Sequence, residues 1–297
     1  MEYIFLCILA NIGIFVSFRL FPQYRINTMQ AIVVNYLICV VTGMFFIGPA
    51  DLLGSFKVNE PWVIVAVMLG VVFVFIFYLM AITTQKMGMT VSTIAAKMSL
   101  VIPVGVSIWV FAVQTKEYTY LNYMGILLAV AAILMASIKN GTDKTSHSAK
   151  GGSILFPIAI FILAGSIDST INYTNLKYLT TENEPLFPIV IFASSFLVGS
   201  IFIMATRSKL ETKNVIAGAL LGVVNYFSVY FLVKSLSAFN NDGSMVYPVL
   251  NVGIILFSSL VSVIVFRERL LPLNKIGLVV AVMAVVFIFY QEIGSYF

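Results

Sequence analysis

The chain has 297 residues, of which 61% are hydrophobic and 10% charged, and its 17 Lys and Arg outnumber its 12 Asp and Glu to give a net charge of +5. Soluble domains average about 45–50% apolar and about 25% charged residues, so a water-soluble fold is excluded and the expected solvent is lipid. Nearly all the cations lie in short segments between apolar runs, where they contact phospholipid head groups. The positive charge therefore does not indicate nucleic-acid binding.

The apolar runs predict an all-α integral membrane protein. A transmembrane helix needs about 20 mostly apolar residues, and ten segments of the sequence meet this requirement. Pro, Gly, Asn or charged residues interrupt the chain between them, as at Lys86-Met87-Gly88. The predicted spans are residues 2–21, 29–49, 62–83, 90–113, 119–138, 153–174, 186–206, 214–236, 243–266 and 272–291.

The polar segment at residues 139–152, KNGTDKTSHSAKGG, is the longest break between the apolar runs and is interpreted as a linker. It divides the chain into residues 1–138 and residues 153–297, each with five predicted helices. The only histidine, His147, lies in this segment, and both cysteines lie in apolar runs, where a thiol is most often a small buried hydrophobe. We therefore expect no metal site and no cofactor.

The two halves share a sequence repeat. Residues 121–135 read LNYMGILLAVAAILM and residues 273–287 read LNKIGLVVAVMAVVF, with six of fifteen positions identical, including a common Leu-Asn-x-x-Gly opening. These segments are the fifth and tenth predicted spans, so five crossings separate them and they run in opposite directions. The sequence thus predicts two inverted five-helix repeats, an arrangement typical of secondary transporters.

These features together resemble the drug/metabolite transporter superfamily, and the EamA-like family most closely. Besides the ten spans in two five-helix halves, the resemblance rests on a Glu after the fourth and ninth spans (Glu117, Glu268) and a Gly early in the fifth and tenth (Gly125, Gly277). It implies a carrier of the bacterial cytoplasmic (inner) membrane that moves a small metabolite by alternating access. It also implies that the fourth and ninth helices line a cavity between the two EamA-like repeats.

Charge also predicts an orientation. Twelve Lys and Arg lie on the side opposite the N-terminus, whereas the N-terminal side carries four, namely Lys57, Lys116, Lys177 and Lys234. The excess of cations on cytoplasmic loops places both termini outside and residues 139–152 in the cytoplasm. Members of the resembled family are usually drawn with both termini inside, so both orientations stay open.

Only two ionisable residues, Lys97 and Asp168, lie well inside predicted spans. A charge at the bilayer centre costs about 2.5–3.5 kcal/mol even on the lenient insertion scale, so each is expected to face protein or water. For Lys97 the alternative is a side chain that extends to the nearer membrane surface. Asp168 shares a helix face with Asn172, and the alternative there is a helix that ends early.

The ninth predicted span places Tyr247 and Asn251 near one face, and the resemblance makes that span a wall of the cavity. The predicted substrate-binding residues are therefore Lys97, Asp168, Asn172, Tyr247 and Asn251. This set suits an anion or a zwitterion such as an amino acid. Because buried ionisable groups can titrate near neutral pH, Lys97 or Asp168 is also expected to couple transport to protons.

Other polar and small residues within the spans are interpreted as packing devices. Asn11, Asn35 and Asn225 are expected to form interhelical hydrogen bonds, each worth about 0.6 kcal/mol. Gly218 and Gly222 form a small-xxx-small pair that indicates close helix packing.

The function predicted is secondary-active transport by a permease or exporter. Walker, GxSxG and HExxH motifs are absent from the sequence, so no catalytic residues are assigned and an enzyme is not expected. An integral-membrane enzyme and a structural membrane protein without transport activity are the alternatives. The expected partners are a small-molecule substrate and membrane lipid, with the chain acting as a monomer or homodimer.

Overall fold

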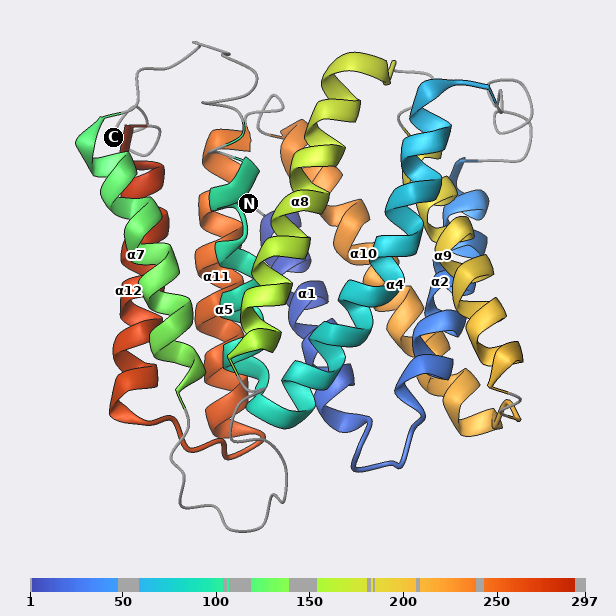
Figure 1. Ribbon diagram of the computed structural model, residues 1–297, viewed down its shortest axis with the longest axis horizontal. Helices are drawn as coiled ribbons and strands as arrows, with labels where there is room; N and C mark the ends of the chain where they lie inside the picture. The colour runs from blue at the N-terminus through green and yellow to red at the C-terminus, as the bar shows by residue number, and fades with distance from the viewer. Residues whose placement is uncertain are drawn as a thin grey trace.

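The computed structural model describes most of the chain, and all the regular secondary structure that it describes is helical (Figure 1). The predicted linker at residues 139–152 and the repeat-flanking Glu117 lie outside the described part. The described residues are 2–47, 59–103, 106, 119–138, 154–180, 183, 185–206, 209–238 and 243–291.

Eight of the described helices are long and apolar enough to cross a bilayer, and α5 and α12 are shorter apolar helices. The chain is therefore an all-α, multi-pass integral membrane protein. The helices are α1 (Glu2–Leu20), α2 (Thr28–Ile47), α4 (Pro61–Met87), α5 (Met89–Met98), α7 (Tyr120–Ser137), α8 (Leu155–Tyr178), α9 (Leu186–Ala205), α10 (Thr212–Ala238), α11 (Gly243–Ile264) and α12 (Pro272–Ile288).

One difference from the predicted spans lies at the junction of α4 and α5. Helix α4 continues to Met87 instead of ending near residue 83, so Gly88 alone separates it from α5. Gly88 has φ 102°, a backbone conformation that glycine adopts without a steric penalty. One residue therefore makes the turn, whereas the sequence pattern predicted a connection from residue 84 to residue 89. Helix α5 ends at Met98, and the predicted span 90–113 falls partly outside the described residues.

The helices pack in pairs. α7 lies against α12, α2 against α10 and α9, and α4 against α9 and α8. α1 contacts α10 and α11, and α5 contacts α8 and α11. In Figure 1, α7 and α12 form one edge of the molecule, α2 and α9 form the other, and α1, α5, α8 and α11 lie between them.

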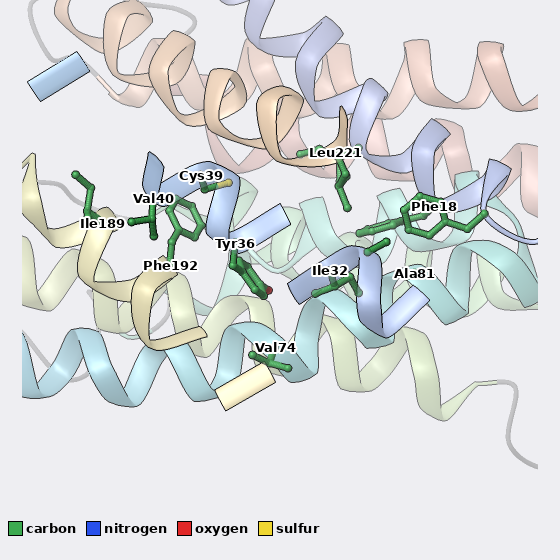
Figure 2. Packing of buried hydrophobic residues seen from close by; sticks show 13 residues of the cluster. Phe18, Ile32, Tyr36, Cys39, Val40, Val74, Ala81, Ile189, Phe192 and Leu221 are labelled. Carbon is green, nitrogen blue, oxygen red and sulfur yellow. The ribbon is translucent and has the colours of Figure 1, made fainter. Parts of the chain in front are cut away.

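One apolar core surrounds α2 where it meets α1, α4, α9 and α10 (Figure 2). The ring of Tyr36 is fully buried in it and stacks against Phe192. Its hydroxyl donates a hydrogen bond of 2.8 Å to the carbonyl oxygen of Phe73, so the one polar atom of this side chain is satisfied. Since a polar group without a partner costs several kcal/mol in lipid, this bond is what permits a tyrosine there.

The repeated Leu-Asn-x-x-Gly motif joins α7 to α12. The backbone N–H of Thr119 donates to Oδ1 of Asn122 at 2.8 Å, so Asn122 caps its own helix. Its Nδ2 donates to the carbonyl oxygen of Ile288, at the end of α12, at 2.7 Å. One amide thus satisfies polar groups at the start of one helix and the end of the other.

The second copy of the motif makes the same contacts in reverse. The backbone N–H of Leu271 donates to Oδ1 of Asn274 at 3.0 Å, and Nδ2 of Asn274 donates to the carbonyl oxygen of Ala136 in α7 at 2.8 Å. A Cβ atom at Gly125 would lie 2.8 Å from the backbone nitrogen of Ile288, and one at Gly277 would lie 3.0 Å from that of Ala136. The glycines therefore allow the backbone contact that the asparagines need.

The packing interpretation of α10 is confirmed. A Cβ at Gly218 would lie 2.5 Å from the carbonyl oxygen of Ala31, and one at Gly222 would lie 2.8 Å from that of Asn35. Beside them, Asn225 Nδ2 donates to Asn35 Oδ1 at 3.2 Å, an interhelical bond of the kind expected. Both cysteines, Cys7 and Cys39, are buried free thiols, as predicted.

Replacing Gly125 or Gly277 by Val should separate α7 from α12 and weaken both asparagine bridges. We expect each variant to lose about 1–3 kcal/mol of stability, the usual cost of overpacking, measured as thermal or SDS-induced unfolding in detergent. Ala131→Val, on the partly exposed side of α7, is the matched control and should unfold like the parent protein. Equal effects at Gly125 and Ala131 would contradict the proposed role of the glycine.

Candidate functional site

Lys97 lies on α5 and reaches a partner inside the bundle. Its Nζ donates a hydrogen bond of 3.0 Å to Oδ1 of Asn11 on α1. Asn11 is held in turn, because its Nδ2 donates to the backbone carbonyl of Cys7 at 2.9 Å. That second bond turns the Oδ1 atom toward the ammonium. The side chain of Lys97 is partly buried and is anchored on a neighbouring helix.

Asp168 approaches Lys97 from α8. One turn earlier, Gly165 packs so closely on Ile102 that a Cβ would lie 2.5 Å from the Ile102 side chain, so this face of α8 is turned toward the α5 segment. The Asp168 carboxyl interacts with the charge of Lys97 and with the side chain of Ser99.

No ion pair joins the two charges directly. Among the described residues, the Lys97 ammonium and the Asp168 carboxylate form no contact within the 4.0 Å that defines a salt bridge. The side chain of Asp168 is nevertheless exposed. The two charges therefore interact through space, without a direct contact.

Helix α11 contributes to the same region. Tyr247 is 43% exposed and lies near enough to Asp168 for the two groups to interact electrostatically. Asn251 lies one turn further along α11 and is 9% exposed. Pro248, between them, lies inside the helix and has no N–H to donate.

The structure brings three of the five predicted substrate-binding residues together, namely Lys97, Asp168 and Tyr247. Asn172 is exposed one turn beyond Asp168, and Asn251 is buried below Tyr247. In the described part of the chain, no hydrogen bond or charge interaction links either asparagine to Lys97.

Sequence reasoning missed the residues that hold Lys97. Asn11 was interpreted as one of several interhelical hydrogen-bonding asparagines, but its partner is the only cation well inside the predicted spans. Ser99, which interacts with Asp168, was not singled out at all. A polar residue in an apolar helix gives the same sequence signal whether its partner is an amide, as for Asn35, or a charge.

The arrangement of these side chains offers binding groups of both charges. A fixed ammonium and a carboxylate, held apart on different helices, complement a molecule that carries a negative and a positive group of its own. The phenol of Tyr247 adds a hydrogen-bond donor at the exposed side of the site.

Comparison with known proteins finds a similar protein, but that protein has no described function. No family model matches the chain. A protein of Haemophilus influenzae, described as an uncharacterized protein, is 23% identical over 302 residues, which cover 98% of this chain and 99% of that protein. The similarity therefore extends over nearly the full length of both chains. It indicates no function, so a function can be inferred only from the site.

The hydrogen bond between Asn11 and Lys97 can be measured by a double-mutant cycle. Asn11→Ala and Lys97→Met, made singly and together, should give a coupling energy of about 1–1.7 kcal/mol, near the top of the range for interhelical hydrogen bonds in membranes. Reversible unfolding in SDS is the measurement. Asn35→Ala combined with Lys97→Met is the control and should be additive, because Asn35 bonds Asn225 instead. Additivity in both cycles would contradict the bond.

Proposed function

We propose that this protein is a secondary-active transporter, a permease or exporter of a small amino-acid-like metabolite, that works by alternating access. The observation that carries the proposal is the pair of separated charges, Lys97 held by Asn11 and Asp168 facing it without a direct ion pair. Charges within a bilayer are costly, and in membrane proteins they mark substrate or ion pathways. A substrate carboxylate would bind Lys97 and a substrate ammonium would bind Asp168.

The helix packing supports the finer architecture that we propose, ten spans in two inverted repeats of the EamA-like family. Advancing every helix by five places along the chain converts the α2–α10 contact into α9–α4, the α1–α10 contact into α8–α4, and the α1–α11 contact into α8–α5. The α7–α12, α2–α9 and α5–α11 contacts map onto themselves. Equivalent helices run in opposite directions in Figure 1, as a two-fold axis in the membrane plane requires.

We propose further that α5 and α11 line the cavity between the halves and that the protein resides in a bacterial inner membrane. One of the two charges, Lys97 or Asp168, then couples substrate movement to protons. The resemblance to drug/metabolite transporters supports the location, and the two ionisable groups within the helix bundle support the coupling. The proposed partners are the small-molecule substrate and lipid, with no catalytic step and no cofactor.

The transport proposal is tested by flux. The full-length protein is screened for thermal stabilisation by amino acids and related zwitterions, and uptake of a stabilising compound is then measured in proteoliposomes with an imposed pH gradient. Lys97→Met and Asp168→Asn should each reduce flux at least about 100-fold, the effect of losing one charged contact worth about 3 kcal/mol.

Matched controls are Lys234→Met and Glu211→Gln, which remove exposed charges outside the site and should leave flux unchanged. Full pH-dependent flux in both site variants would show that Lys97 and Asp168 are structural. Saturable binding without any flux, with turnover of the compound, would favour a membrane enzyme instead.

Orientation is tested by labelling from outside the cell. In a chain whose two native cysteines are replaced by serine, Gln23→Cys reports on the end where α1 meets α2, and Asn59→Cys reports on the opposite end; both positions are exposed. The cation distribution predicts that an impermeant thiol reagent labels Asn59→Cys in intact cells and spares Gln23→Cys. The reverse pattern would support the orientation usually drawn for the resembled family.

A further inference from the structure

One ion pair joins four helices at the end of the bundle where α1 ends. Glu268 follows α11, and its Oε1 lies 3.0 Å from Nε of Arg19 at the end of α1. The same carboxylate accepts from the backbone N–H of Met89, the first residue of α5, at 3.3 Å, and from the hydroxyl of Ser262 on α11. Arg19 also donates to the carbonyl oxygen of Gln85 on α4 at 3.1 Å.

The turn at Gly88 is shaped to receive this carboxylate. A Cβ atom at Gly88 would lie 2.7 Å from Oε2 of Glu268, so only glycine leaves room for it. The first N–H of α5, that of Met89, donates to Glu268, and a negative charge at this helix N-terminus is stabilised by the helix dipole. The junction between α4 and α5 and the ion pair are therefore one structural unit.

Above this unit the bundle is sealed by apolar side chains. Phe15 and Met89 are 2% and 0% exposed, in a cluster formed by α1, α5 and α11. Lys97 lies eight residues beyond Met89, about 12 Å along α5 at 1.5 Å per residue. Asp168 and Tyr247, which approach Lys97 from α8 and α11, are exposed. Between the site and Arg19, buried apolar side chains close the bundle.

We infer that the Arg19–Glu268 ion pair, seated on the Gly88 turn, is the gate that closes one end of the central site and breaks when the transporter changes its access. The inference rests on the proposed transport function. The side chain of Arg19 is 26% exposed and that of Glu268 is 10% exposed, so water can solvate both groups as they separate. A pair that water can reach contributes at most about 1 kcal/mol, so it can stabilise a closed state without making that state permanent.

The test follows the exposure of Thr90, which lies next to Met89. Thr90 is 1% exposed and its hydroxyl has no partner, so Thr90→Cys is a mild change that reports on opening. Cys7 and Cys39 are replaced by serine, because both thiols donate to carbonyl oxygens and a hydroxyl preserves those bonds. The full-length protein is placed in lipid nanodiscs, and the rate of thiol modification is measured relative to Gln23→Cys.

With the gate intact, Thr90→Cys should react slowly. Glu268→Gln keeps an acceptor for Met89 and Ser262 but removes the charge, and Arg19→Gln removes the opposite charge; each should raise the rate about tenfold, the population shift that follows from losing one hydrogen bond to a charged group. Arg19→Lys keeps the charge and should remain protected. Lys213→Gln breaks the exposed 2.8 Å pair with Glu211 at the start of α10, the end of that helix that lies at the same end of the bundle in Figure 1, and should have no effect.

An unchanged rate in folded Glu268→Gln and Arg19→Gln, or an equal rise in Lys213→Gln, would overturn the gate. If Glu268→Gln does not fold, the comparison of Arg19→Gln with Arg19→Lys decides the matter. Thiol labelling needs no substrate, so the gate can be tested independently of the proposed transport function. If the charge variants expose Thr90→Cys but the protein transports no compound, the transport proposal is wrong and the gate stands. If the protein transports a compound but Thr90→Cys stays protected in the charge variants, the gate alone is wrong.

Discussion

Inside a bilayer there is no water to satisfy a backbone group at a helix end, so the protein must supply the partner itself. In this chain asparagine does so repeatedly, because one amide offers both an acceptor and two donors. Asn122 and Asn274 each cap one helix and close the end of another. These bonds need backbones in contact, which explains why a glycine follows each asparagine three residues later. The paired helices at one edge of the molecule depend on that combination.

The same requirement explains how much of the fold the sequence predicts. Long apolar runs predict where the helices lie, and the repeated Leu-Asn-x-x-Gly motif marks α7 and α12, the two helices that pack against each other. The length of α4 was predicted wrongly because Lys86 and Gly88 have the composition of a loop. In the structure Lys86 lies in the last turn of a continuous helix, where a cation complements the dipole. A local pattern does not distinguish a one-residue turn from a longer one, because the difference lies in a single φ angle.

The candidate site was predictable to the extent that a charge in an apolar helix stands out. Lys97 and Asp168 were found for that reason, and Tyr247 through the family resemblance. Asn11 was not found as a site residue, because its role depends on which helix packs beside α1. The ion pair of Arg19 with Glu268 was beyond sequence reasoning for the same reason. Asn11 is one of several asparagines in apolar helices, and Arg19 and Glu268 lie at or just beyond helix ends, so none of them stands out in the sequence. Only the packing of helices distant in the chain brings each of them to its partner.

The reciprocal contacts between α7 and α12 have a consequence for how such a molecule could arise. Each helix presents an asparagine and a glycine, and each receives those of the other, so the surface is complementary to itself in the manner of an isologous dimer. A single ancestral half that bore this surface could associate with a copy inserted upside down in the membrane. Fusion of the two genes would then fix the opposite membrane orientations of the two halves, which separate copies would adopt only by chance. Fused halves would afterwards be free to diverge, so that one could gain a lysine and the other an aspartate.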